Sequence, residues 1–368
     1  MINVSSVDLR GNEVRYVNDV LASTWISSTG SYVDGFESAF SAFLGGVGSV
    51  TCSNGTVALH LALDALGIGP GDEVIVPALT YVASVNAVRY VGATPVLVDV
   101  QPGTLVMDPQ RVAAAITPST RALMPVHLYG NPADMDALRA LAAHREIRIV
   151  EDAAEALGTL YKGQPVGTLG DTATFSFYGN KLITTGEGGM VTYSTPSVGE
   201  SIRVLRGQGQ DPNRRYWHTV IGYNYRLTNM QCALGLAQLE QVQHKIERRE
   251  QIRSRYSQHF RQIADLFRPL EMEPWAKSVC WLFTGLVGDQ AALTRDELAV
   301  ALEVRGIESR PIFYTINDMP AHVDLHGSFP VAADASRRGI SLPTHTLLTD
   351  DDVDRVAESV IELLKGTP

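Results

Sequence analysis

Apolar residues in the first 150 positions of the chain fall into short continuous runs that alternate with stretches of helical spacing. The runs predict buried strands at 73–77, 94–99, 122–126 and 147–150, and the spaced stretches predict helices at 54–66, 82–91, 109–116 and 135–144. This alternation is typical of an α/β domain in which helices cover a mostly parallel sheet. Ligands of such domains bind beyond the carboxyl ends of the strands. Asp99, His127 and Asp152 each follow a strand, so each is placed to face a site.

The second half of the chain has a different pattern. One long helical tract is predicted from about 228 to 267, and we interpret it as the link to a smaller domain. That domain is predicted to contain strands at 281–287 and 308–311 and helices at 294–305 and 350–364. We therefore expect a large domain over residues 1–240, which includes an N-terminal arm, and a smaller α+β domain over residues 241–368.

The composition is that of an ordinary globular protein. Of the 368 residues, 45% are hydrophobic and 19% are charged, and the formal net charge is −10. This acidic balance disfavours a general binder of nucleic acid or of anionic membranes. Cys52, Cys232 and Cys280 have no CxxC spacing, so we expect free thiols in a reducing compartment and no metal site. The chain shows no signal-peptide pattern and no long apolar stretch, so we expect a soluble cytoplasmic protein.

Polar residues within two apolar runs indicate a more specific chemistry. Lys181 lies between apolar segments and before the glycine-rich turn Gly186-Glu-Gly-Gly189, and Asp152 ends the run Arg148-Ile-Val-Glu-Asp152. A desolvated lysine amine can form a Schiff base with an aldehyde, and a buried carboxylate can keep a pyridine nitrogen protonated. Together they predict pyridoxal 5'-phosphate (PLP) as a cofactor. Taken alone, each has an ordinary alternative, a surface lysine or a helix N-cap.

Other positions fit the same cofactor, again with alternatives. The turn Ser53-Asn-Gly55-Thr56 opens a helix and could bind a phosphate, or Ser53 or Thr56 could simply cap that helix. Ser176 could add a hydroxyl to the phosphate site. Tyr81 could stack on a cofactor ring or pack in the core. If a helix began at the aspartate, Glu155 would share its face and could bond a ring hydroxyl or remain a solvated charge.

Several segments resemble a known family of enzymes. The segments are Ser53-Asn-Gly-Thr-Val-Ala-Leu-His-Leu-Ala-Leu63, Gly69-Pro-Gly-Asp-Glu-Val-Ile-Val-Pro77, Glu151-Asp-Ala-Ala-Glu155 and Gly179-Asn-Lys181. They resemble the PLP-dependent nucleotide-sugar aminotransferases, the DegT/DnrJ/EryC1/StrS group of the aspartate aminotransferase fold (fold type I). The resemblance covers nearly the whole chain, from about Trp25 to the C-terminal helix, and is strongest from 51 to 230. It implies a large PLP-binding domain with a mostly parallel sheet and a smaller C-terminal domain.

The resemblance also implies roles for matching positions. Lys181 corresponds to the lysine that forms the Schiff base, and Asp152 to the partner of the pyridine nitrogen. The other implied cofactor contacts are Gly55, Thr56 and Ser176 at the phosphate, Tyr81 on the ring face and Glu155 near the ring hydroxyl. Asn224 corresponds to an asparagine that reaches the phosphate of the neighbouring subunit, which implies a homodimer with shared active sites. Members with histidine in place of the lysine are dehydratases, so Lys181 favours amino transfer.

The stretches 25–37, 216–229 and 310–314 resemble group members that aminate GDP-4-keto-6-deoxymannose to GDP-perosamine with L-glutamate as donor. The positions expected to contact the nucleotide sugar are Ser28, Thr29, His127, Trp217, His218 and Tyr314. A lone histidine is nevertheless more often a structural hydrogen-bonding residue, so the role of His127 is open. The alternatives are a 3-keto sugar, a dTDP- or UDP-linked sugar, a sugar dehydratase, and a PLP-binding regulatory protein without turnover.

Overall fold

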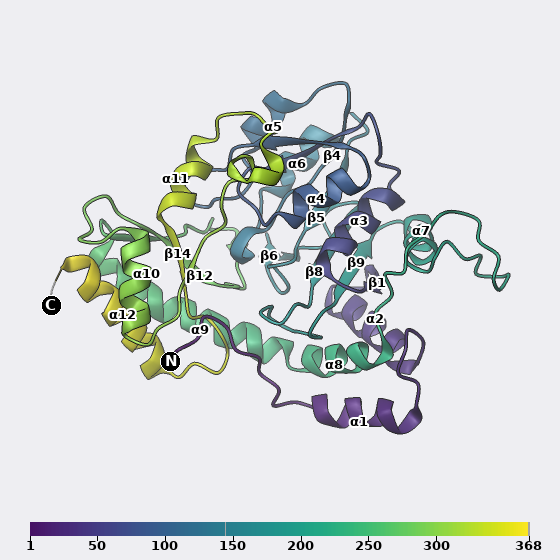
Figure 1. The fold of residues 1–368 in the computed structure, drawn as a ribbon, viewed down its shortest axis with the longest axis horizontal. Helices are drawn as coiled ribbons and strands as arrows, with labels where there is room; N and C mark the ends of the chain where they lie inside the picture. The colour runs from purple at the N-terminus through teal and green to yellow at the C-terminus, as the bar shows by residue number, and fades with distance from the viewer. Residues whose placement is uncertain (144, 367–368) are drawn as a thin grey trace.

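The computed structural model describes residues 1–143 and 145–366, and its centre is a seven-stranded sheet in the order β1-β9-β8-β5-β4-β2-β3 (Figure 1). The strands are β1 (Gly48–Cys52), β2 (Glu73–Pro77), β3 (Thr94–Val98), β4 (Thr120–Leu123), β5 (Arg148–Asp152), β8 (Thr172–Ser176) and β9 (Gly189–Tyr193). Among these described strands only β9 runs antiparallel to its neighbours. The prediction of an α/β fold with a mostly parallel sheet is therefore confirmed.

Helices cover both faces of this sheet and create two separate cores. One face packs against α3 (Gly55–Ala65), α4 (Ala83–Tyr90) and α7 (Pro196–Arg206). The other packs against α2 (Ser31–Phe43), α5 (Pro109–Ala115), α6 (Met135–Ala142) and α8 (Asn229–Glu240). Successive strand residues point to opposite faces. In β2, Val74 and Val76 accordingly join the first core and Ile75 joins the second.

A second, smaller sheet has the order β10-β12-β14-β13. Its strands are β10 (Phe267–Pro269), β12 (Phe283–Val287), β13 (Arg310–Pro311) and β14 (Gly339–Leu342), and it packs with α9 (Val242–Phe260), α10 (Arg295–Val304), α11 (Pro330–Arg338) and α12 (Asp350–Lys365). The remaining short elements are β6 (Leu160–Tyr161), β7 (Gln164–Pro165), β11 (Ala276–Lys277), η1 (Leu128–Gly130), η2 (Arg261–Ile263), η3 (Ile316–Asp318) and η4 (Pro320–His322). No described helix combines the length and apolar character needed to cross a membrane.

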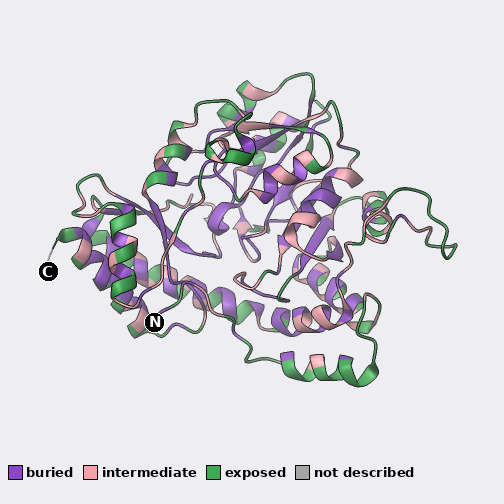
Figure 2. Ribbon diagram, viewed as in Figure 1, coloured by how far each residue is buried: buried purple, intermediate pink, exposed green. Residues whose placement is uncertain are grey.

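The start of the chain packs against the C-terminal half. Ile2 lies in the same core as α10 and α12, pairs with Ile307, and donates its N–H to the carbonyl of Gly306 at 2.7 Å. Figure 1 shows the N-terminus beside this part of the molecule. From there the chain runs along α8 to α1 (Glu13–Ser23), which Figure 2 shows largely exposed. The N-terminal arm, which the sequence predicts as part of a large domain, therefore also packs with the helices that cover the smaller sheet.

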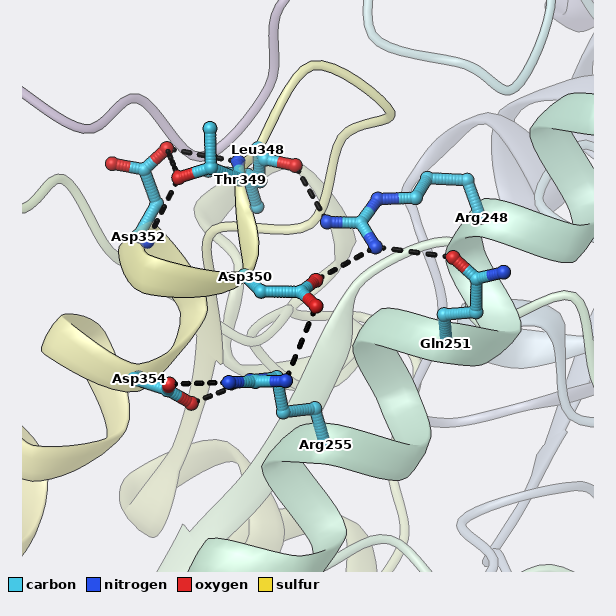
Figure 3. A network of polar contacts seen from close by, with 8 residues as sticks. All are labelled: Arg248, Gln251, Arg255, Leu348, Thr349, Asp350, Asp352 and Asp354. Carbon is cyan, nitrogen blue, oxygen red and sulfur yellow. Dashed lines mark hydrogen bonds and ion pairs between the residues drawn. The ribbon is translucent and has the colours of Figure 1, made fainter.

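The helical tract predicted from 228 to 267 is two helices, α8 and α9, which meet at Gln241. Helix α9 is joined to α12 by a network of charged side chains (Figure 3). Arg255 contacts Asp354 at 2.5 Å and Asp350 at 3.2 Å, and Arg248 contacts Asp350 at 2.9 Å. These ion pairs link the C-terminal helix α12 to α9.

Most predicted elements are present, with altered ends. The strand expected at 281–287 begins at Phe283, and the one at 308–311 is only the pair Arg310–Pro311. The helix expected at 135–144 ends at Ala142, and its predicted last residue, His144, lies outside the described residues. Residues 367 and 368, which the prediction assigns to the smaller domain, also lie outside them.

Candidate active site

The carboxyl end of β5 places Asp152 in a buried, polar environment. Ser84 Oγ donates a hydrogen bond of 2.7 Å to Asp152 Oδ2, and the N–H of Ala154 donates one of 3.2 Å to Oδ1. Burial raises the pKa of Asp152, and the hydrogen bond from Ser84 and the charge of Lys181 oppose that rise. A turn follows β5, so no helix begins at Asp152, and the alternative in which Asp152 is a helix N-cap is wrong.

Lys181 lies in the loop that follows β8, with its side chain only 14% exposed. Its Nζ is 3.7 Å from Glu155 Oε1 and 4.0 Å from the centroid of the Trp281 ring. Burial lowers the pKa of Lys181, and the charges of Glu155 and Asp152 partly restore it. A lowered pKa increases the fraction of neutral amine, which is the nucleophilic and basic form.

Glu155 is held next to Lys181 by the loop rather than by a helix face. Its Oε2 accepts a 2.8 Å hydrogen bond from the N–H of Tyr129. Burial raises the pKa of Glu155 to about 7, and the charge of Lys181 opposes that rise. A carboxyl group with this pKa can hold or release a proton near neutral pH.

The turn before α3 forms a cradle that fits a phosphate. Asn54 is the N-cap, accepting from the N–H of Val57 at 3.0 Å, so neither Ser53 nor Thr56 caps the helix. The N–H groups of Gly55 and Thr56 lie in the first turn, where helices leave donors unpaired and favour anions. A Cβ placed on Gly55 would come within 2.9 Å of Ser176 Cβ. Glycine therefore lets the Ser176 hydroxyl approach this helix terminus.

These groups fit PLP. The cradle of Gly55, Thr56 and Ser176 suits the phosphate, the buried carboxylate of Asp152 suits a protonated pyridine nitrogen, and the buried amine of Lys181 suits the aldehyde. All of these groups lie at or just after the ends of strands of one sheet. Gly55 and Thr56 follow β1, Asp152 ends β5, and Lys181 follows β8.

Tyr81 and Tyr314 lie together at an exposed edge. Tyr81 is 57% exposed and Tyr314 is 56% exposed. The ring of Tyr81 is 5.6 Å from that of Phe313, and the backbone of Leu79 pairs with Thr315. Both predicted contact residues therefore have surface free for a ligand, and their roles stay predictions.

His127 and Asp99 are engaged within the protein. The N–H of Ala133 donates to His127 Nδ1 at 3.1 Å, so Nε2 carries the proton and donates to Glu151 at 3.0 Å. His127 is fully buried, and no ring nitrogen is left for a sugar. The expectation that Asp99 faces a site is wrong, because its carboxylate accepts the N–H groups of Val331 and Ala332 at the start of α11.

The other predicted substrate and partner contacts lie on separate segments. Trp217, His218 and Asn224 belong to a loop that projects beyond α7 (Figure 1). In the described chain none of them bonds to Lys181, Asp152 or Glu155; His218 bonds to the carbonyl of Gln208, and Asn224 accepts from Arg226 at 2.9 Å. Ser28 and Thr29 lie between α1 and α2. Their roles remain predictions.

Sequence reasoning missed Ser84, Tyr129 and Trp281. Ser84 follows Thr80 by four residues after β2 and bonds to it at 2.9 Å, a spacing that could have drawn attention to it. Trp281 precedes β12, and the sequence around it is typical of an aromatic residue in a core, so no local signal connects it with Lys181.

Comparison with known proteins places these residues in context. A sequence profile described as the DegT/DnrJ/EryC1/StrS aminotransferase family matches residues 7–361. The chain is 47% identical over 364 residues to the GDP-perosamine synthase of Caulobacter vibrioides, covering 99% of this chain and 98% of that protein. It is 45% identical over 364 residues to the GDP-perosamine synthase of Escherichia coli O157:H7, covering 98% of each. The PLP-form structure of Spr1654 from Streptococcus pneumoniae matches with a TM-score of 0.93 at 32% identity, covering 99% of both chains.

Proposed function

Because the chain belongs to the DegT/DnrJ/EryC1/StrS aminotransferase family, we propose that it transfers an amino group from L-glutamate to C4 of GDP-4-keto-6-deoxymannose, giving GDP-perosamine. The family makes it a PLP-dependent sugar aminotransferase. The names of the relatives at 47% and 45% identity support the choice of nucleotide and sugar.

The buried amine of Lys181 is the main observation that supports the proposal, because amino transfer requires a group that moves a proton next to the cofactor. When bound, PLP supplies an aldehyde that accepts the amino group and a ring that withdraws electrons. The Nζ of Lys181 would remove the α-proton of the donor and later return a proton, acting as base and then as acid. Burial favours the neutral amine for the first role, and Glu155 at 3.7 Å favours the ammonium for the second.

The remaining residues bind and orient. Asp152 would keep the proton on the pyridine nitrogen, and the hydrogen bond from Ser84 supports the ionised carboxylate that this requires. Gly55, Thr56 and Ser176 would hold the phosphate, and Tyr81 would cover the ring. Tyr314, on the same exposed edge, is placed to contact the sugar or nucleotide.

The working unit proposed here is a homodimer in which Asn224 completes the phosphate site of the other subunit. The loop of Asn224 supports this, because it projects from the body of the chain and exposes Tyr216, Trp217, Val220 and Ile221. We also propose that the enzyme works in the cytoplasm. Its free cysteines, all buried, fit a reducing compartment.

The test is a product assay with the full-length, PLP-loaded protein. L-glutamate and GDP-4-keto-6-deoxymannose are added, and GDP-perosamine is sought by mass spectrometry, with the matching dTDP-linked 4-keto sugar and the Lys181→Ala variant as controls. The expected result is GDP-perosamine only from the GDP sugar and only with Lys181. If pyridoxamine phosphate forms but the GDP sugar gives no amino sugar, the proposed substrate is wrong, while the assignment as an aminotransferase stands.

A further inference from the structure

The ammonium of Lys181 lies against an aromatic face that comes from a distant part of the chain. Its Nζ is 4.0 Å from the centroid of the Trp281 ring, within the range in which the negative face of an indole attracts a cation. Trp281 precedes β12 of the smaller sheet, whereas Lys181 follows β8 of the large one. The contact therefore joins the reactive lysine to the C-terminal half of the molecule.

Trp281 is fixed in place on several sides. Its indole N–H donates to the carbonyl of Asn180, the residue before Lys181, at 2.9 Å. Its backbone N–H donates to the carbonyl of Tyr129 at 3.2 Å, and its carbonyl accepts from the buried guanidinium of Arg249. Trp281 as a whole is 5% exposed. Because the indole is bonded to the backbone of Asn180, the ring keeps its position relative to the lysine.

Tyr129 contacts both groups that lie next to the Lys181 ammonium, the Trp281 ring and the Glu155 carboxylate. Its ring stacks on Trp281 with centroids 5.9 Å apart and planes inclined by 15°, and its N–H holds Glu155. Tyr129 has a left-handed backbone (φ 53°, ψ 21°), which costs energy for a residue other than glycine and persists only where packing enforces it. The same residue thus orients both partners of Lys181.

We propose that Trp281 is a positioning residue that holds the free ammonium of Lys181 against its ring face, beside Glu155, whenever the amine is not bound to the cofactor. A buried cation needs compensation for its lost hydration, and the indole supplies part of it without forming a bond that must be broken. The importance of Trp281 for turnover rests on the proposed aminotransferase function. In that function the Lys181 amine alternates between a form bound to the cofactor and a free form, and the free amine must return to the same position in each cycle.

The contact can be measured directly by NMR. The chain has five lysines, so reductive methylation with ¹³C-formaldehyde gives few signals, and Lys181→Arg identifies the one of interest. Spectra are recorded on the full-length protein loaded with pyridoxamine phosphate, a form in which lysine amines are free, and on the cofactor-free protein. The ring current of an indole should shift the Lys181 methyl signal upfield in both. Trp281→Leu should abolish that shift, and Trp281→Phe should retain part of it.

A matched control is available at the surface, where Lys162 lies 5.9 Å from the ring of Trp275. Trp275→Leu should leave the Lys181 signal unchanged, and circular dichroism melts show whether each variant is folded.

In turnover, Trp281→Leu should lower kcat by about 10- to 100-fold with a smaller effect on KM, and Trp281→Phe should recover part of the loss. An unshifted Lys181 signal in the wild type, or a shift that survives Trp281→Leu, would overturn the inference. If the protein takes up no pyridoxamine phosphate, the proposed function fails, and the cofactor-free spectrum still decides the role of Trp281.

Discussion

Ser84 and Asp152 are 68 positions apart in the sequence, and the Ser84 hydroxyl donates a 2.7 Å hydrogen bond to the Asp152 carboxylate. Ser84 lies in the first turn of α4, and its oxygen is also 2.9 Å from the hydroxyl of Thr80. This arrangement fixes the direction of the carboxylate from the neighbouring helix. It also stabilises the ionised form, which burial alone disfavours.

Ser84→Ala should therefore weaken catalysis without abolishing it. The variant loses the hydrogen bond, so the pKa of Asp152 should rise further and the pairing with a protonated pyridine should weaken. We expect the half-reaction with L-glutamate to slow about tenfold, which corresponds to about 1.4 kcal/mol, close to the lower end of about 1.5–3 kcal/mol for a hydrogen bond to a charged group. Asp152→Asn should be slower still. Stopped-flow absorbance measures both rates, with Ser201→Ala on the exposed surface of α7 as control. An unchanged rate for Ser84→Ala would contradict the assigned role.

Lys181→Ala should abolish turnover. The variant lacks the amine that is proposed to move the α-proton, and loss of a general base typically lowers rates about 10²- to 10⁴-fold. Amino-sugar formation is measured by mass spectrometry. Lys162→Ala is the control, since Lys162 pairs with Asp136 at 2.6 Å on the surface. Turnover that persists in Lys181→Ala would refute the assignment of Lys181.

Gly55→Ala should weaken cofactor binding. The added methyl would lie 2.9 Å from Ser176 Cβ and 3.3 Å from its hydroxyl oxygen, so it would displace the serine from the phosphate cradle. We expect the dissociation constant for PLP to rise about tenfold or more, a loss of about 1.4 kcal/mol. Equilibrium titration of the cofactor-free protein gives this constant. Gly69→Ala is a suitable control, because its nearest neighbour would be 3.8 Å away. Equal affinities of the two variants would place the phosphate elsewhere.

Glu155→Gln should change how stability depends on pH. Burial raises the pKa of Glu155 from its usual 4.5 to about 7, so between these values the folded protein binds more protons here than the unfolded chain. The stabilisation from this group is complete below pH 4.5 and is lost as the pH rises through about 7, by up to about 3 kcal/mol.

Urea unfolding of the cofactor-free protein at pH 5 and pH 7.5 measures this effect. The wild type should lose more stability between the two pH values than Glu155→Gln, whose amide does not titrate. Glu200→Gln, at an exposed position on α7, should behave as the wild type does. Equal pH dependence in wild type and Glu155→Gln would show that Glu155 does not carry the shifted pKa.

Local patterns in the sequence were enough to predict the architecture and the principal chemistry. The alternation of short apolar strands with helices predicted the α/β sheet, because strand and helix periodicities are local properties. The cofactor was also predictable, since Lys181 and Asp152 stand out as charged residues at the ends of apolar runs. The resemblance to the aminotransferase group supplied the reaction class, and the comparisons confirmed it.

The polar residues around the lysine could be identified only from the way in which distant segments pack. Asp99, His127 and Asp152 all follow strands, yet Asp99 caps α11 and His127 bonds to Glu151, while the pKa of Asp152 responds to the charge of Lys181. Ser84 and Trp281 reach the site because α4 and the chain before β12 pack there, and no local signal connects Trp281 with Lys181. These assignments depend on which distant segments meet and on which hydrogen bonds are already satisfied. Neither property is encoded in the periodicity of a single segment.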